Sequence, residues 1–266
     1  MATVLKSLMV TLAAGLLTAG CAGVTRNALP AELASKAEVP GIPGVRAWGS
    51  DYSPLFQADL VESAKQARGV DPRGVVGPDG YANVLALSGG GPDGAFGAGL
   101  LCGWTKAGTR PTFKLVTGMS TGALIAPFAF VGPEYDHVLK QFYTTLHTKD
   151  IFTPKSLTSL LEGTDSLADS TPLAALLEKV VDDKQMAAVA DGHRKGRRIY
   201  TIATRDGIDF KMAHIPDDYE RKATEMFDPA DMARLFDMAF DMAKAGYPWM
   251  SLPPGLKERT TKRPAG

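Results

Sequence analysis

Residues 84–96 read VLALSGGGPDGAF, and residues 115–124 read LVTGMSTGAL. In both places an apolar run stops at a turn that contains glycine, and small or apolar residues follow. A short apolar run of this kind is typical of a buried strand in a parallel sheet. We therefore expect strands at residues 83–88 and 113–117, each followed by a helix, at 95–104 and 123–130. Strands that alternate with helices indicate an α/β fold.

The glycine-rich turn at residues 89–94 can bind an anion. Its glycines allow backbone N–H groups to face outward at the start of a helix. A dinucleotide-binding loop also uses such glycines, but it calls for an acidic residue about 20 positions further on. No acidic residue occurs from Ala95 to Pro133, so a dinucleotide site loses support.

The second turn, Gly118-Met119-Ser120-Thr121-Gly122, has the G-x-S-x-G pattern of a nucleophile elbow. Flanking glycines permit the strained strand-to-helix turn that presents the serine hydroxyl. The positive end of the helix dipole favours negative charge that develops beside it. The pentapeptide alone is moderately specific. Its place after a glycine loop, between a predicted strand and a predicted helix, makes the pair of motifs much more specific.

The two motifs together resemble those of the patatin-like phospholipase family, over residues from about 82 to 198. The resemblance implies a three-layer α/β/α sandwich that hydrolyses acyl esters, usually of lipids, and it implies no metal or organic cofactor. Ser120 would be the nucleophile, and backbone N–H groups of Gly89, Gly90 and Gly91 would hold the oxyanion. The family pairs its serine with one aspartate of a D-G-G or D-G-A motif and needs no histidine.

An ordinary α/β-hydrolase triad is the nearest alternative. It requires an aspartate and then a histidine after Ser120, and His193 or His214 meets this requirement by chain order alone. Its oxyanion loop normally lies farther upstream of the elbow than the glycine turn does here. The spacing therefore favours the serine–aspartate dyad.

The aspartate of such a dyad has two candidates after Ser120. Asp191-Gly192 ends a helical pattern that begins at Thr171-Pro172, so Gly192 is expected to be a C-terminal glycine of the helix and Asp191 has no catalytic role. Asp206-Gly207 is the better candidate. It also joins two strand-like runs, 198–203 and 208–213, where Asp-Gly is a strong hairpin signal, and Ile208 stands where the family has Gly or Ala. The hairpin turn is the stronger of the two interpretations.

The residues after the elbow suggest that the sandwich is incomplete. Residues 205–255 resemble the C-terminal end of longer, lipoprotein-type patatin relatives, in which the catalytic aspartate precedes this tail. We therefore hypothesise that an internal stretch with the D-G-G/A motif is lacking, with the join near residues 199–204. This leaves two functional interpretations. One is a lipid acyl hydrolase, and the other is a catalytically degenerate lipoprotein that binds lipid or a protein partner without turnover.

Composition excludes several other classes of protein. The chain has 266 residues, of which 45% are hydrophobic, and 29 basic residues balance 29 acidic ones. This composition is that of a globular protein, and zero net charge argues against a nucleic-acid partner. Two cysteines, Cys21 and Cys102, are too few for a disulfide framework or a cysteine-rich zinc site. Cys102 is expected to be a buried thiol.

The N-terminus has the pattern of a bacterial lipoprotein signal. Lys6 precedes a short apolar run, and Ala19-Gly20 leads into Cys21, although Thr18 stands where leucine is usual. We expect residues 1–20 to be a signal peptide and a lipidated Cys21 to anchor the chain to a membrane of the cell envelope. Residues 21–80 then form a tether and irregular arm, with a helix at 60–68, and residues 81–266 form the patatin-like α/β domain.

Two further predictions concern structure rather than catalysis. Asp228-Pro229 is expected to cap and open a helix that ends at Gly246, because apolar residues recur there at helical spacing. Asp93 is expected to orient its own loop.

Overall fold

The computed structural model describes residues 33, 41, 44–45, 52–70, 81–155, 168–200, 213–216 and 218–250. The chain divides into two compact units. One comprises residues 1–46 and 152–170, and the other comprises residues 47–151 and 171–266. The first unit contains a short antiparallel ladder in which β3 (Thr153–Pro154) pairs with β4 (Ala168–Asp169). The larger unit contains both glycine motifs.

A three-stranded parallel sheet organises the larger unit, in the order β1 (Val84–Leu87), β2 (Leu115–Gly118), β5 (Arg198–Tyr200). In register, Leu87 pairs with Gly118, so both motifs follow strands that end at the same edge of the sheet. The helices between these parallel strands confirm the predicted α/β class.

The prediction that the first strand is buried is wrong for one face. Leu85 and Leu87 pack against the core, whereas Val84 and Ala86 are exposed. A strand's side chains point alternately to opposite faces, so the four apolar residues of β1 cannot all reach one core.

The remaining elements of the larger unit are helical. After α3 (Pro54–Arg68), the 3₁₀ turn η2 (Gly91–Asp93) leads into α4 (Gly94–Lys106), and β2 leads into α5 (Thr121–Val131). The turn η3 (Pro133–Tyr135) then precedes α6 (Asp136–Thr145) and α7 (Thr148–Ile151), followed by α9 (Thr171–Val180), α10 (Asp183–Arg194) and α11 (Pro229–Lys244). Among the residues described, no helix is both long and apolar enough to cross a membrane.

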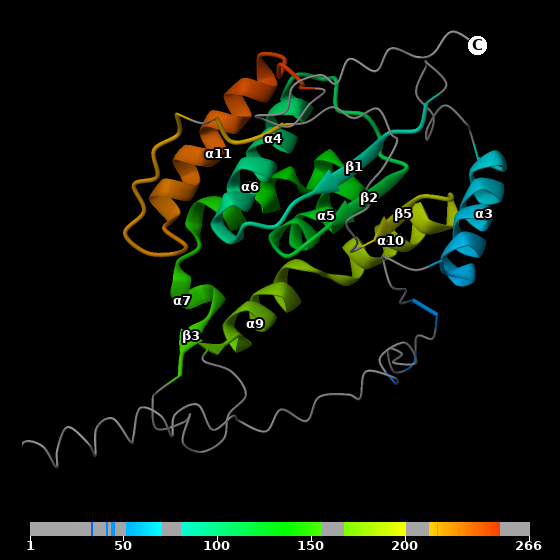
Figure 1. The fold of residues 1–266 in the computed structure, drawn as a ribbon, viewed down its shortest axis with the longest axis horizontal. Coiled ribbons are helices and arrows are strands. Elements are labelled where there is room, and N and C mark those ends of the chain that lie inside the picture. The colour runs from blue at the N-terminus through cyan, green and yellow to red at the C-terminus, as the bar shows by residue number, and fades with distance from the viewer. Residues whose placement is uncertain are drawn as a thin grey trace, which may run out of the picture. The chain divides into compact units, whose positions relative to one another are not determined.

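Helices α4 and α11 lie side by side at very short range (Figure 1). A Cβ atom added to Gly99 would lie 2.1 Å from the carbonyl oxygen of Phe236, and one added to Gly103 would lie 2.1 Å from that of Phe240. Two glycines one turn apart therefore let the backbone of α4 touch the backbone of α11. Around this contact, Leu101, Leu235 and Phe236 are almost fully buried.

Helix α11 matches its prediction closely. Asp228 is its N-cap, and the side chain accepts hydrogen bonds from the N–H groups of Ala230 and Asp231 at 2.9 and 3.2 Å. Pro229 stands in the first turn, and the predicted end at Gly246 is a residue with φ of 92° just beyond the cap.

The structure corrects the predicted role of Gly192. Residues 171–194 form two helices rather than one, because the chain leaves the helix after Val180 and Asp182 caps α10. Gly192 lies inside α10, where an added Cβ would meet the ring of Phe130 at 2.5 Å. The left-handed glycine after this helix is Gly196, with φ of 82°. Gly192 is thus a packing residue between α10 and α5.

Helix α3 begins at Pro54, before the predicted Leu60, and it packs against β5 although an irregular arm was expected in this part of the chain. The guanidinium of Arg198, which is 3% exposed, donates to both carboxylate oxygens of Asp59 at 2.8 and 2.9 Å. The Tyr200 hydroxyl also donates to Asp59. Burial raises the pKa of Asp59, but hydrogen bonds from Arg198 and Tyr200 lower it more, and the net shift is downward.

Replacing Asp59 by alanine is expected to lower the free energy of unfolding by roughly 2 kcal/mol, because a buried guanidinium loses its charged partner. Glu62→Ala on the same helix is the matched control, since it removes only an exposed pair with Lys65 and should cost less than about 0.5 kcal/mol. Urea unfolding of the two variants checks this. Equal losses of unfolding free energy in the two variants would show that the ion pair between Arg198 and Asp59 adds no more to stability than an exposed pair does.

Candidate active site

Ser120 occupies a strained turn between β2 and α5. Its φ of 50° and ψ of −123° make it the one residue other than glycine with a positive φ in the part of the chain that the structure describes. Such a conformation costs a residue with a Cβ about 1–3 kcal/mol. The side chain is exposed at the N-terminus of α5, so the hydroxyl is presented where the helix dipole is positive.

The two glycines that flank the serine are required by close backbone packing. A Cβ added to Gly118 would lie 2.3 Å from the carbonyl oxygen of Gly122, and one added to Gly122 would lie 2.4 Å from that of Leu87. The Met119 N–H continues the strand pairing by donating to Leu87 at 3.1 Å. The turn can therefore close only because both flanking residues lack a side chain.

The glycine loop lies directly against the serine. An added Cβ on Gly89 would stand 3.1 Å from the Cβ of Ser120. Gly90 and Gly91 have φ values of 143° and 56°, which favour glycine. Among the described residues, the N–H groups of Gly90 and Gly91 have no protein acceptor. Two free donors thus lie in the loop beside the serine hydroxyl.

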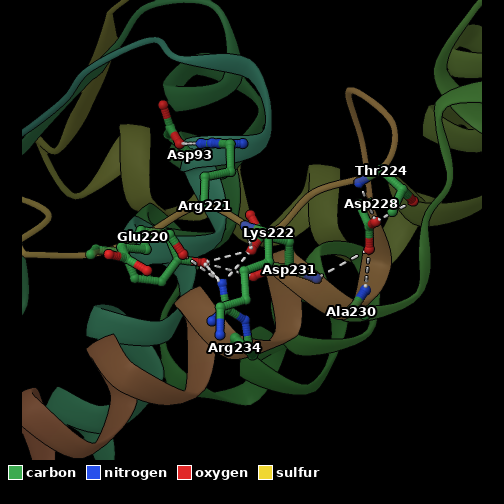
Figure 2. A network of polar contacts seen from close by, with 10 residues as sticks. Asp93, Glu220, Arg221, Lys222, Thr224, Asp228, Ala230, Asp231 and Arg234 are labelled. Carbon is green, nitrogen blue, oxygen red and sulfur yellow. Dashed lines mark hydrogen bonds and ion pairs between the residues drawn. The ribbon is translucent and has the colours of Figure 1, made fainter.

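Charged residues join the segment before α11 to the glycine loop on one side and to α11 on the other (Figure 2). Arg221 forms an ion pair with Asp93, which ends η2. Lys222 donates its N–H to the Asp231 carboxylate at 2.8 Å, and Arg234 forms an ion pair with the same carboxylate at 2.5 Å. The Asp93 N–H donates to the Gly90 carbonyl at 3.1 Å, but this is a backbone bond of the turn, so the predicted role of the Asp93 side chain in its own loop remains a prediction.

The cap of α11 makes stability depend on pH. Hydrogen bonds from the N–H and hydroxyl of Thr224 and from the N–H of Asp231 lower the pKa of Asp228 from 3.8 to about 2. Because the folded protein favours the ionised form, Asp228 stabilises it above pH 4, and this contribution is lost as the pH falls through 2.

Asp228→Asn keeps a capping oxygen but no charge, so its deficit in melting temperature relative to the wild type is expected to shrink between pH 5 and pH 2. Thermal unfolding across this range measures the effect. Asp237→Asn, on the exposed side of the same helix, controls for the loss of one carboxylate. Its difference in melting temperature from the wild type should not change between pH 5 and pH 2. A deficit that stays constant with pH would refute the role of the Asp228 charge.

A largely apolar cavity of about 280 Å³ opens beside Ser120. Its lining comes from five helices, the two motifs, the link between α6 and α7, and the segment before α11. It consists of Gly91, Ser120, Thr121, Leu124, Phe142, Tyr143, Leu146, Ile151, Leu173, Phe227 and Met232. A cavity with an apolar lining and a few polar groups at one end suits a ligand with an apolar tail.

A buried hydrogen bond fixes the wall of this cavity next to the serine. The hydroxyl groups of Thr121 and Tyr143 lie 2.6 Å apart, and both residues are buried. Burial raises the pKa of Tyr143 to about 12, so this side chain is a neutral phenol. An added Cβ on Gly94 would lie 2.4 Å from the Thr121 hydroxyl oxygen, so the pair also fits against the start of α4.

The proposed acid–base partners of the serine fall in different places. Asp206 lies outside the described residues, so its roles as catalytic aspartate and as hairpin turn both remain predictions. Asp191 is on α10 and is paired with Lys195 at 2.6 Å. His193 is in the last turn of α10, and His214 contacts Ile215 and Met250. Within the described segments, no hydrogen bond reaches the Ser120 hydroxyl.

Of the two cysteines, only Cys102 lies in the part of the chain that the structure describes. Cys102 is a free, buried thiol, as predicted, and burial raises its pKa to about 12. Cys21 lies outside the described residues. In the segments that the structure describes, no group of histidine, cysteine and acidic residues could hold a metal ion.

Several cavity residues carry no sequence motif. Tyr143 and Phe142 lie on α6, and Phe227 precedes α11. The apolar spacing of α6 gives the only signal for the first two, and it does not distinguish a core residue from a cavity wall.

A comparison of the sequence with models of protein families identifies the family of the chain. The model described as patatin-like phospholipase matches residues 85–261. This range spans both glycine motifs and α11, and the chain belongs to the patatin-like phospholipase family. The family is one of hydrolases that act on lipid esters. The comparisons with curated proteins and with solved structures gave no match.

Proposed function

We propose that this protein is a serine acyl-ester hydrolase that acts on lipids or other carboxylic esters through Ser120. One juxtaposition carries the proposal. The exposed hydroxyl of a strained elbow stands beside two free N–H groups of a glycine loop, at the mouth of an apolar cavity. Each part meets one need of ester hydrolysis, namely a nucleophile, an oxyanion site and a site for the acyl chain.

The reaction follows from these three parts. The Ser120 oxygen attacks the carbonyl carbon of the ester and gives its proton to a general base. The carbonyl oxygen, now an oxyanion, accepts hydrogen bonds from the loop at Gly90 and Gly91. The C–O bond to the alcohol breaks, the alcohol leaves with a proton, and an acyl-serine remains. Water then attacks this ester and releases the carboxylic acid and the free serine.

Asp206 is our proposed general base, by analogy with the family's dyad. The positive end of α5 and the loop donors support this arrangement, because they favour the serine alkoxide and the oxyanion without a histidine. We further propose that a lipidated Cys21 anchors the protein to a membrane of the bacterial envelope, which brings the site close to lipid esters.

Labelling with a fluorophosphonate tests the nucleophile. The full-length chain, carrying Cys21→Ser to prevent lipidation, is expected to become labelled, and the same chain with Ser120→Ala is not. Ser170→Ala, which removes an exposed serine, is the control and should label normally. If Ser120 is labelled, Asp206→Asn is expected to abolish the labelling as well.

The contrary results are equally informative. Folded protein that remains unlabelled would refute the hydrolase and favour the degenerate lipoprotein that binds lipid without turnover. Labelling that survives Ser120→Ala would place the nucleophile at another residue.

A further inference from the structure

The cavity beside Ser120 adjoins a second, smaller cavity of about 10 Å³, which has room for about one methyl group or water. The second cavity is lined by Phe128, Val138, Leu139, Leu177 and Val180, together with three residues that also line the first. These three shared residues are Leu124, Phe142 and Tyr143. They form a partition between the two cavities.

The three partition residues differ in their connection to the elbow. Leu124 lies in the first turn of α5, directly after the elbow, so a change there acts on the helix that supports Ser120. Tyr143 is 3% exposed and is fixed by the hydrogen bond to Thr121. Phe142 has only apolar contacts, with its ring centre 5.1 Å from that of Tyr143. Phe142 is therefore the member of the partition that can be changed with least effect on the elbow.

The size of the first cavity limits the ligand that fits before this partition. An apolar cavity of about 150 Å³ holds benzene, so 280 Å³ holds roughly ten carbon atoms. Ser120, where the ester carbonyl would react, is the one exposed residue among those that line the cavity, so we take the entrance to be there. Leu124 of the partition follows in the first turn of α5. An acyl chain that enters from the serine therefore meets Leu124 and Phe142.

We propose that Phe142, supported by Leu124, sets the length of the acyl chain, so that the protein takes chains of about eight to ten carbons and excludes a palmitoyl chain. The proposal rests on the proposed function, since it assigns the acyl site of the same reaction. Removal of the Phe142 ring would join the two cavities and free about the volume of benzene, enough for roughly four to six more carbons.

A series of p-nitrophenyl esters tests the assignment. With the full chain, hydrolysis is expected to be fastest for the octanoate and decanoate and at least tenfold slower for the palmitate. Phe142→Ala is expected to raise the ratio of the palmitate rate to the octanoate rate at least tenfold. Leu177→Ala, which enlarges only the second cavity and leaves the partition intact, is the matched control and should leave this ratio unchanged.

A second variant works in the opposite direction and covers the case in which Phe142→Ala does not fold. Leu124→Phe narrows the cavity before the partition, so the fastest ester should shift from decanoate toward butyrate. A wild-type preference for palmitate, or a profile of rates that neither variant changes, would overturn the assignment.

Binding separates this inference from the proposed function. Calorimetry on the Ser120→Ala chain is expected to show that decanoate binds more tightly than palmitate. In the double variant that also carries Phe142→Ala, palmitate is expected to bind more tightly than decanoate. If this pattern holds while the wild type hydrolyses no ester, the acyl site stands and the hydrolase proposal fails. If the wild type hydrolyses esters but Phe142→Ala leaves the affinities for decanoate and palmitate unchanged, the hydrolase stands and the role of Phe142 is refuted.

Discussion

Replacement of Ser120 by alanine or by glycine is expected to lower kcat/KM for ester hydrolysis by roughly three to six orders of magnitude. Both changes remove the nucleophilic oxygen and leave the glycine loop and the cavity in place. The remaining rate then comes from the oxyanion site and from substrate binding alone. Rates measured with p-nitrophenyl octanoate check the size of the loss.

The two variants are expected to differ in stability although they agree in activity. Alanine keeps the Cβ that makes the left-handed conformation at φ of 50° unfavourable, so its unfolding free energy should stay within about 0.5 kcal/mol of the wild type. Glycine relieves this strain, at some cost in the entropy of the unfolded chain, and should raise the unfolding free energy by about 1 kcal/mol.

Urea unfolding of both Ser120 variants measures this difference. Equal stabilities would show that the elbow stores no strain at Ser120. Full activity in either variant would exclude this serine as the nucleophile. A fall in activity together with a gain in stability is the signature of a residue kept for catalysis at the expense of the fold.

Replacement of Gly99 by alanine is expected to lower the unfolding free energy by more than about 3 kcal/mol, or to prevent folding. The new Cβ would lie 2.1 Å from the carbonyl oxygen of Phe236 and 2.9 Å from its Cα. Both are backbone atoms, so no change of rotamer relieves the overlap, and α4 and α11 must move apart. Gly103→Ala should act in the same way against Phe240.

Gly97 provides the matched control on the same helix. Its added Cβ would meet only the Cδ1 atom of Ile125, at 3.6 Å, which is an ordinary contact. Gly97→Ala should therefore be neutral or should stabilise the protein by up to about 1 kcal/mol, because alanine favours the helix. Similar urea midpoints for the Gly97 and Gly99 variants would contradict the close approach of the two helices.

Local sequence signals were enough to predict most of the elements around the site. The glycine loop, the elbow at Ser120 and the capped helix after Asp228 all follow from residues close to one another in the chain. Glycines required by a positive φ, such as Gly91, belong to recognisable turns. These features could be predicted because their physical causes are local.

Features that depend on distant partners could not be predicted. In the sequence, Gly192 after Asp191 has the pattern of a glycine that ends a helix. In the structure its lack of a side chain makes room for Phe130 on another helix. The apolar run of β1 carries no sign that Val84 faces outward. The partners of Gly99 on α11, and of Arg198 on α3, are likewise set by the folded arrangement and not by neighbouring residues.

The close contact between α4 and α11 limits how early during translation this part of the fold can form. Helix α4 starts directly after the glycine loop, whereas α11 is among the last described elements to leave the ribosome. Until then Gly99, Leu101 and Gly103 have no backbone or side chains from α11 to pack against. Because contacts between such distant segments form slowly, the loop and the elbow are expected to gain their final rigidity only after α11 has been translated.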